Sequence, residues 1–379
     1  MEIPGLKSSA TTYPIAIIIA TLMLCKNVVA TEDLSAYQVA SFQTPDDVST
    51  FDHFAIHART GNIYIGATNY VHHLYSDFEF GQTVSTTSQC ATIGGRCINH
   101  NKVLVIDYEA QKIITCGSEN EGRCQMRNLA DISISLDNIN SVAASASLST
   151  EVMIARGPFG QNMLYVAATY DPKRYGIGSV TPIARRSIRS YGDALLASDA
   201  EIFFTPAAIY NKPFMISYMG VFNWRQYVHF ATIQRVDYDP FPFISTSGYV
   251  SKLNRVCQGS KDFKSFTEII LECRGSLQDR PYNLVQSVHV GKPGNFLADY
   301  FDMLNITEEE DGLLYAVFAH STEPESYQPT NSSAICVFKM ADIEEKFSEA
   351  IYGCLRNGSD FGLAYVRDNN CPAFPVSII

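Results

Sequence analysis

Two cysteines that lie close together in the sequence, Cys116 and Cys124, enclose a turn that contains two glycines. The turn follows an apolar run over residues 103–107, which is typical of a buried β-strand. A disulfide across such a small loop stabilises the folded state by about 2–3 kcal/mol. The segment therefore predicts a strand that ends in a sharp turn and a local covalent clasp, a combination suited to an oxidising compartment.

The first thirty residues have the features of a secretory leader. Lys7 provides the positive charge, an apolar core of about twelve residues runs from Pro14 to Cys25, and the Val-Val-Ala of residues 28–30 is a suitable cleavage site. A membrane-spanning helix needs roughly twenty apolar residues, so a cleaved signal peptide is favoured over an uncleaved anchor. We predict a signal peptide over residues 1–30 and an exported chain over residues 31–379.

Composition and charge limit the fold classes and the kinds of partner that are possible. The net charge of −11 disfavours binding to nucleic acid, because a negative surface repels phosphates. Tyrosine (21) and phenylalanine (22) greatly outnumber tryptophan (1), and 46% of the residues are apolar, which favours β-strands around a large core. A chain of this length is typical of a large all-β barrel or propeller.

Several apolar runs, each next to a turn, predict buried central strands. They recur at irregular intervals along residues 61–67, 102–107, 112–115, 163–168, 226–233 and 313–318. Repeated sheet units with variable insertions favour a β-propeller. Residues 171–200 are rich in glycine and proline and are interpreted as an insertion between strands.

One helix is predicted near the C-terminus, with Asp342 as its cap and Asn357-Gly358 as its stop. Ile343, Phe347, Ile351 and Leu355 share one face, so we expect this helix to buttress a sheet.

The chain has ten cysteines, and removal of Cys25 with the leader leaves an odd number. One thiol must then lack a partner within the chain. Spacing favours Cys90–Cys97 and Cys116–Cys124 as local pairs and leaves the rest open. A zinc site is the alternative, but the separations are too long and no histidine lies at a matching distance.

No segment carries a recognisable catalytic or metal-binding pattern, and we predict no catalytic, cofactor or metal residues. His53 and His57 could share a metal if they lie on one strand, but packed or surface histidines are favoured; His72 and His73 would point to opposite faces. The acidic residues 308–311 and the basic residues 185–189 are interpreted as solvated loops or strand edges. A calcium site for the acidic run, and a processing site or anion patch for the basic run, are the alternatives.

Three N-glycosylation sequons begin at Asn305, Asn331 and Asn357. In an exported chain they predict exposed loops at these positions.

The clasp resembles the Sema domain of plexins. The matching residues are Cys116-Gly117-Ser118, Gly122, Cys124, Arg127 and Leu129; semaphorins usually carry a CGT-type segment here. The resemblance extends from about residue 48 to the end. It includes residues 51–57, 60–69, 164–170 and 250–257, and a cysteine–helix–cysteine pattern over residues 334–354.

This resemblance implies a β-propeller of the Sema type, with seven blades in the family and about five covered here. It implies the disulfides Cys273–Cys336 and Cys354–Cys371, and it agrees with the odd count in leaving Cys257 unpaired. Residues 31–379 are accordingly expected to be an incomplete Sema domain. In the family an N-terminal strand closes the last blade. Because the last blades are expected to be missing here, we expect the strand near residues 51–57 to have no sheet to complete.

The function implied is that of a binding module without enzymatic activity or cofactor: the extracellular part of a plexin-like receptor for semaphorins in axon-guidance-type signalling. It would bind semaphorins through their Sema domains, with a receptor dimer or co-receptor as a further partner. It would lie at the plasma membrane within a longer receptor, or otherwise be secreted. A secreted Sema-domain ligand or decoy is the alternative, and a propeller glycosidase is a more distant one.

Overall fold

The computed structural model divides the chain into two units, Met1–Gln43 and Thr44–Ile379, and the fold below belongs to the second. The residues that the structure describes are 38–44, 50–87, 98–119, 122–139, 142, 145–169, 182–188, 198–202, 215–236, 248–261, 263, 265–275, 280–294, 297–298, 312–323 and 325–357. The predicted leader, residues 1–30, lies outside them. Within the described residues, no helix has the length and apolar character needed to cross a bilayer.

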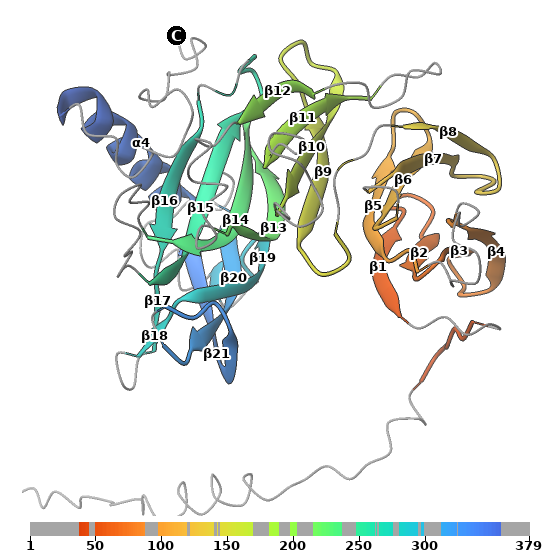
Figure 1. The fold of residues 1–379 in the computed structure, drawn as a ribbon, viewed down its shortest axis with the longest axis horizontal. Coiled ribbons are helices and arrows are strands. Elements are labelled where there is room, and N and C mark those ends of the chain that lie inside the picture. Colours follow the sequence, from red (N-terminus) through yellow and green to blue (C-terminus); the bar gives the residue numbers. More distant parts are fainter. Residues whose placement is uncertain are drawn as a thin grey trace, which may run out of the picture. The chain divides into compact units, whose positions relative to one another are not determined.

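The described chain is dominated by antiparallel sheets whose strands follow one another in sequence order (Figure 1). The first sheet contains β1 (Phe51–Ile56), β2 (Ile63–Ala67), β3 (Tyr70–Leu74) and β4 (Phe80–Ser85). The second contains β5 (Asn101–Asp107), β6 (Lys112–Gly117), β7 (Cys124–Asn128) and β8 (Ser135–Ile139). The third contains β9 (Thr150–Arg156), β10 (Asn162–Ala168), β11 (Ile183–Ser187) and β12 (Ser198–Ile202).

The remaining sheets follow the same plan. The fourth contains β13 (Ser217–Trp224), β14 (Tyr227–Arg235), β15 (Tyr249–Cys257) and β16 (Thr267–Leu271). The fifth contains β19 (Leu284–Gly291), β20 (Leu313–Ser321) and β21 (Pro329–Lys339). A short pair, β17 (Cys273–Arg274) and β18 (Pro281–Tyr282), lies between these two in the sequence. All the strands predicted from apolar runs are present.

Successive sheets pack face to face with their first strands adjacent. β1 contacts β5, β5 contacts β9, β9 contacts β13, and β13 contacts β19. Each of the four junctions has its own buried apolar cluster, for example Tyr64 and Val71 of the first sheet with Leu104 and Ile113 of the second. First strands that follow one another around an axis, with sheets radiating outward, are the arrangement of propeller blades.

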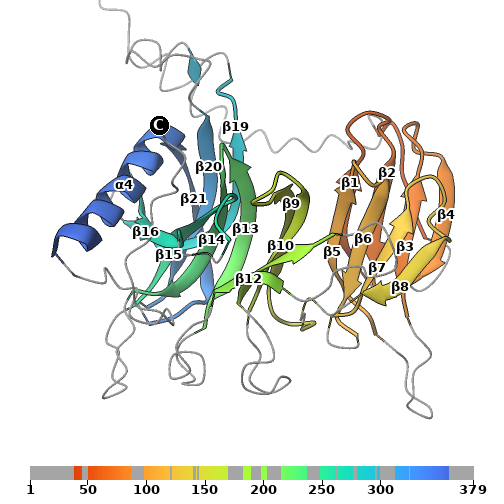
Figure 2. The ribbon, with the colours of Figure 1, turned by 90° about the horizontal axis from the view of Figure 1, so that it is seen from above.

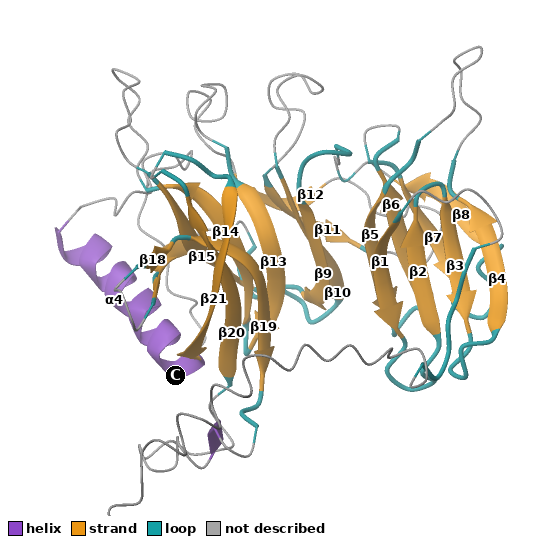
Figure 3. Ribbon diagram, turned by 90° about the horizontal axis from the view of Figure 1, so that it is seen from below, coloured by secondary structure: helices purple, strands orange, loops and turns teal. Residues whose placement is uncertain are grey.

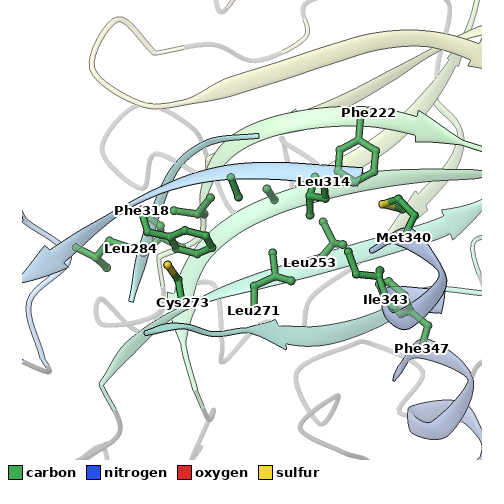
Figure 4. Packing of buried hydrophobic residues seen from close by; sticks show 14 of the residues in the cluster. Phe222, Leu253, Leu271, Cys273, Leu284, Leu314, Phe318, Met340, Ile343 and Phe347 are labelled. Carbon is green, nitrogen blue, oxygen red and sulfur yellow. The ribbon is translucent and has the colours of Figure 1, made fainter. Parts of the chain in front are cut away.

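The largest cluster joins the fourth and fifth sheets to the helix α4 (Met340–Asn357) (Figure 4). Ile343, Phe347 and Ile351 are buried, as the spacing predicted, and the helix contacts β16 and β21 (Figure 2). The helix ends at Asn357 as predicted, but it begins at Met340, so Asp342 lies in its first turn and is not the cap. The Met340 amide donates to the Gly312 carbonyl, which holds the start of the helix next to β20.

The expectation that the strand near residues 51–57 lacks a sheet is wrong. β1 is the first strand of the first sheet and pairs with β2, with Phe54 opposite Ile65 and Ile56 opposite Ile63. A tight turn joins the two strands: the His57 amide donates to Asn62, and Gly61 has a φ of +74°. This left-handed conformation suits glycine, so local turn chemistry is sufficient to pair the strand with its neighbour.

The interpretation of residues 171–200 as an insertion is wrong in part, because this range contains all of β11 and the start of β12. β11 lies between β10 and β12 and carries the buried residues Ile183 and Ala184. Because the sequence of β11 contains two arginines and a serine, it lacks the apolar pattern from which the other buried strands were predicted.

Candidate protein-docking rim

Two disulfides lie within the described residues. One joins Cys116 in β6 to Cys124 in β7, and the other joins Cys273 in β17 to Cys336 in β21. Both pairs are among those named from the sequence. The Cys257 thiol at the end of β15 is free and buried. Cys354 in α4 is disulfide-bonded, while Cys371, Cys90 and Cys97 lie outside the described residues, so the remaining two pairings stay predictions.

The sequons fall in different surroundings. Asn331 is exposed, but it lies in β21, the edge strand of the fifth sheet, and not in a loop. An edge strand offers one open side, which makes an asparagine side chain accessible without a loop. Asn357 is the last residue of α4, and Asn305 lies outside the described residues, as do the acidic residues 308–311.

No cluster of three metal-ligating side chains, histidines included, occurs among the described residues. His53 is exposed on β1 and lies 3.1 Å from the Asn101 amide oxygen, whereas His57 follows the strand and is buried. His72 and His73 point to opposite faces of β3, yet both are buried, because the middle of the sheet is covered on both faces.

A set of turns from successive sheets forms a surface at one end of the strands. We call it the rim: the turns that join the first two strands of the first four sheets (57–62, 108–111, 157–161 and 225–226), together with the loop 258–261 after β15. The turns and loops at the ends of the sheets are teal in Figure 3. Turns held by a rigid sheet scaffold are a common place for binding residues.

Side-chain contacts connect the rim from the first sheet to the fourth. The Ala58 amide donates to the Tyr108 hydroxyl (3.0 Å), and the Arg156 guanidinium lies 3.3 Å from the Glu109 carboxylate. The Lys261 ammonium lies 5.3 Å from the centre of the Phe159 ring. Within the fourth sheet, the backbone amide of Gln258 donates to the backbone carbonyl of Gln226 (2.9 Å). The turns are therefore a continuous structural unit.

The rim combines exposed aromatic rings with positive charge. Phe159 is 78% exposed and Tyr108 is 37% exposed. The described rim contains the cations Arg59, Arg225 and Lys261, and Arg156 adjoins it at the end of β9. Against these stands the acidic residue Glu109. On a chain with a net charge of −11, such a surface is a local exception.

Arg185 holds the loop of the rim from inside the molecule. This residue is only 2% exposed; its guanidinium donates to the carbonyls of Ser260 and Lys261 and lies 5.2 Å from the centre of the Phe263 ring. The interpretation of Arg185 as part of a solvated loop or strand edge is therefore wrong. Burial is tolerated because two carbonyls and an aromatic face replace water around the charge. A processing protease could not reach this side chain in the folded chain.

Away from the rim, the first strands of the second and third sheets carry two charged side chains that interact, Lys102 on β5 and Glu151 on the neighbouring β9. Burial raises the pKa of the Glu151 carboxyl to about 7, and the Lys102 charge only partly opposes this effect. The folded state therefore holds a proton between pH 4.5 and about 7 that the unfolded chain has released. This contribution to stability is lost as the pH rises through that window.

Glu151→Gln should remove this dependence of the stability on pH. We expect the variant to match the wild type near pH 5 and to be about 1–2 kcal/mol more stable near pH 8, because the buried carboxylate is gone. Urea unfolding at a series of pH values measures this difference. Parallel stability curves for the two proteins would contradict the assignment.

Comparison with known proteins identifies a matching family and several similar proteins. The Sema domain family matches residues 285–373. The chain is 26% identical to Plexin-A4 of Danio rerio over 381 aligned positions and 25% identical to Plexin-A2 of Mus musculus over 376, in each case over 90% of this chain and 19% of the relative. The chain thus spans about a fifth of the length of the curated plexins that it matches.

Solved structures agree on the architecture. The extracellular region of Plexin A4 (domains 1 to 8) superposes with a TM-score of 0.71 and 24% identity, covering 87% of this chain and 38% of that structure. Drosophila Semaphorin 2a superposes with a TM-score of 0.54 and 15% identity, covering 79% of this chain and 49% of that structure. The predicted all-β propeller of the Sema type is confirmed.

Proposed function

We propose that the chain is the extracellular ligand-binding part of a plexin-like semaphorin receptor, because the Sema domain family matches residues 285–373 and the similar curated proteins are plexins. The observation that carries the proposal is sequence similarity to plexins along 90% of the chain. The chain is a binding module and not an enzyme, as predicted, because plexins and semaphorins are receptors and ligands.

The binding mode that we propose is contact between the Sema domain of this chain and that of a semaphorin. A rigid propeller presents exposed turns, and their shape, aromatic rings and charge determine the partner. The chain would act outside the cell, at the plasma membrane within a longer receptor. Signalling of the axon-guidance type, through rearrangement of a receptor dimer or a co-receptor complex, would follow from ligand binding.

The receptor assignment is favoured over a secreted ligand or decoy. The curated relatives reported above are plexins, and the solved plexin superposes better than the solved semaphorin. The motif Cys116-Gly117-Ser118 is also of the plexin kind. These observations favour a chain that binds semaphorins over a chain that binds plexins.

Binding measurements with purified proteins test the proposal. We expect the full chain, secreted from eukaryotic cells, to bind at least one semaphorin extracellular region of the same organism saturably and to bind plexin extracellular regions weakly or not at all. Biolayer interferometry gives both affinities, with heat-unfolded chain as the control. Binding to plexins alone would establish the ligand alternative, and binding to neither would overturn the receptor assignment.

A further inference from the structure

The turn that carries Phe159 is exposed, and its backbone is held by several hydrogen bonds. The Gly157 amide donates to the Gln161 carbonyl (2.8 Å), and the Gly160 amide donates to the Gly157 carbonyl (3.0 Å). The Arg156 guanidinium donates to the Gly160 carbonyl (2.9 Å), and the Phe159 amide donates to the Gln161 side-chain oxygen (3.0 Å). A large apolar ring is thus held in water by a turn whose backbone groups are satisfied locally.

This arrangement is unfavourable for folding but favourable for association. An exposed phenylalanine gains nothing from the folded core, whereas a residue on a hydrogen-bonded turn loses little backbone entropy when a partner covers it. Aromatic residues with adjacent arginines are enriched among the residues that dominate binding energy. The neighbouring loop is equally fixed, because Arg185 holds the carbonyls of Ser260 and Lys261.

The charge around Phe159 determines the chemistry of its partner. Arg156 is paired with Glu109, and both side chains are more than half exposed. Lys261 reaches over the ring from the fourth sheet. A complementary surface would place an apolar residue against Phe159 and a carboxylate near Lys261 and Arg156.

We propose that Phe159 is the anchor of a protein-docking site and that Arg156 and Lys261 pair with carboxylates of the partner. This inference rests on the proposed function, so the partner is the semaphorin and the docking segment is an acidic one with an exposed apolar residue. The anchor lies on a turn of the third sheet, and the cations lie on the third and fourth sheets.

Two variants test the site in the full chain. Phe159→Ala should weaken semaphorin binding about 30-fold, because an anchor residue contributes roughly 2 kcal/mol or more. Lys261→Glu should weaken it about tenfold, with a larger loss at low salt than at high salt. The matched controls are Tyr352→Ala, an exposed aromatic side chain of α4, and Lys346→Glu, which changes the net charge equally.

Thermal unfolding should be the same for Phe159→Ala and the wild type, since the ring is exposed, and this separates lost contact from lost folding. Unchanged affinity of Phe159→Ala for a semaphorin that the wild type binds would overturn the site and leave the receptor assignment intact. Lack of semaphorin binding by the wild type would overturn both. If Lys261→Glu lost binding to heparin while Phe159→Ala kept full semaphorin affinity, the rim would be a site for anionic glycans and the inference would be wrong.

Discussion

Replacement of Lys252 by methionine is expected to lower the free energy of unfolding by about 3–5 kcal/mol, because it leaves a carboxylate buried without its counter-charge. The Lys252 ammonium, on β15, lies 2.6 Å from the Glu268 carboxylate on β16, and both side chains are less than 5% exposed. The ammonium also donates to the Val236 carbonyl (3.1 Å), and the Gln234 amide donates to the second Glu268 oxygen (3.0 Å).

Urea unfolding measures the effect, and a double variant identifies its cause. Lys252→Met combined with Glu268→Gln should recover most of the loss, because neither charge remains and the Gln234 hydrogen bond can persist. Lys346→Met is the matched control: this lysine also pairs with a carboxylate at 2.6 Å, but in water, so its loss should cost less than about 1 kcal/mol. Equal losses of unfolding free energy for Lys252→Met and Lys346→Met would show that burial does not determine the contribution of the Lys252–Glu268 pair.

The sequence predicted the parts of the fold that local chemistry determines. Apolar runs predicted strands such as β10 and β20, and residues 116–124 predicted both the clasp and the propeller family. The helix was predicted from four apolar residues on one face. In each case the residues that carry the signal lie close together in the chain, so periodicity and turn chemistry were sufficient.

What the sequence could not show depends on packing between sheets. A propeller blade is covered on both faces, so both alternating sets of side chains are buried, and alternation no longer separates inside from outside. His72 and His73 illustrate this, and so does Arg185, whose neighbours Arg186 and Ser187 suggested a solvated edge. The partners of Arg185 are the carbonyls of Ser260 and Lys261, seventy-five and seventy-six positions away, and no local pattern predicts them.

The rim was missed for the same reason. Tyr108, Phe159 and Lys261 occur in three separate turns, and only the radial order of the sheets brings them together. The signal present in the sequence was a glycine-flanked phenylalanine, Gly157-Pro158-Phe159-Gly160, since a large apolar residue at the centre of such a turn is seldom needed for folding.

A second large loss of stability is expected at Arg255, whose guanidinium attaches α4 to the fourth sheet. It lies between the Tyr227 and Phe347 rings, 4.1 and 4.2 Å from their centres, and it donates to the Glu344 carboxylate of the helix. The other Glu344 oxygen lies 3.6 Å from Nε2 of His229, which is fully buried. Arg255→Met should cost about 2–4 kcal/mol at neutral pH, because the carboxylate stays partly buried while its cation is removed.

The loss of unfolding free energy caused by Arg255→Met should become smaller in acid. This direction of change distinguishes an electrostatic cause from lost packing. Burial alone would raise the pKa of Glu344, but the nearby His229 and the Arg255 charge outweigh burial and hold this pKa below its usual value. Burial, assisted by the Arg255 charge and opposed by Glu344, lowers the pKa of His229, so in the wild type the contribution of the neutral imidazole is lost as the pH falls below 6.5. Without the Arg255 charge, the pKa values of Glu344 and His229 both rise. In acid, a proton can then either neutralise Glu344 or give His229 a positive charge beside it, and either event compensates for the missing cation.

Hydrogen exchange read at two pH values tests this attachment locally. At pH 7.5 the amides of α4 should exchange faster in Arg255→Met than in the wild type, with a smaller change in β10, which lies in a different sheet. At pH 5 the difference in α4 should shrink. Lys346→Met, on the exposed side of the same helix, should leave exchange in α4 nearly unchanged at both pH values. A deficit that is the same at pH 5 and pH 7.5 would mean that Arg255 acts through its contacts with Tyr227 and Phe347, and not through its charge.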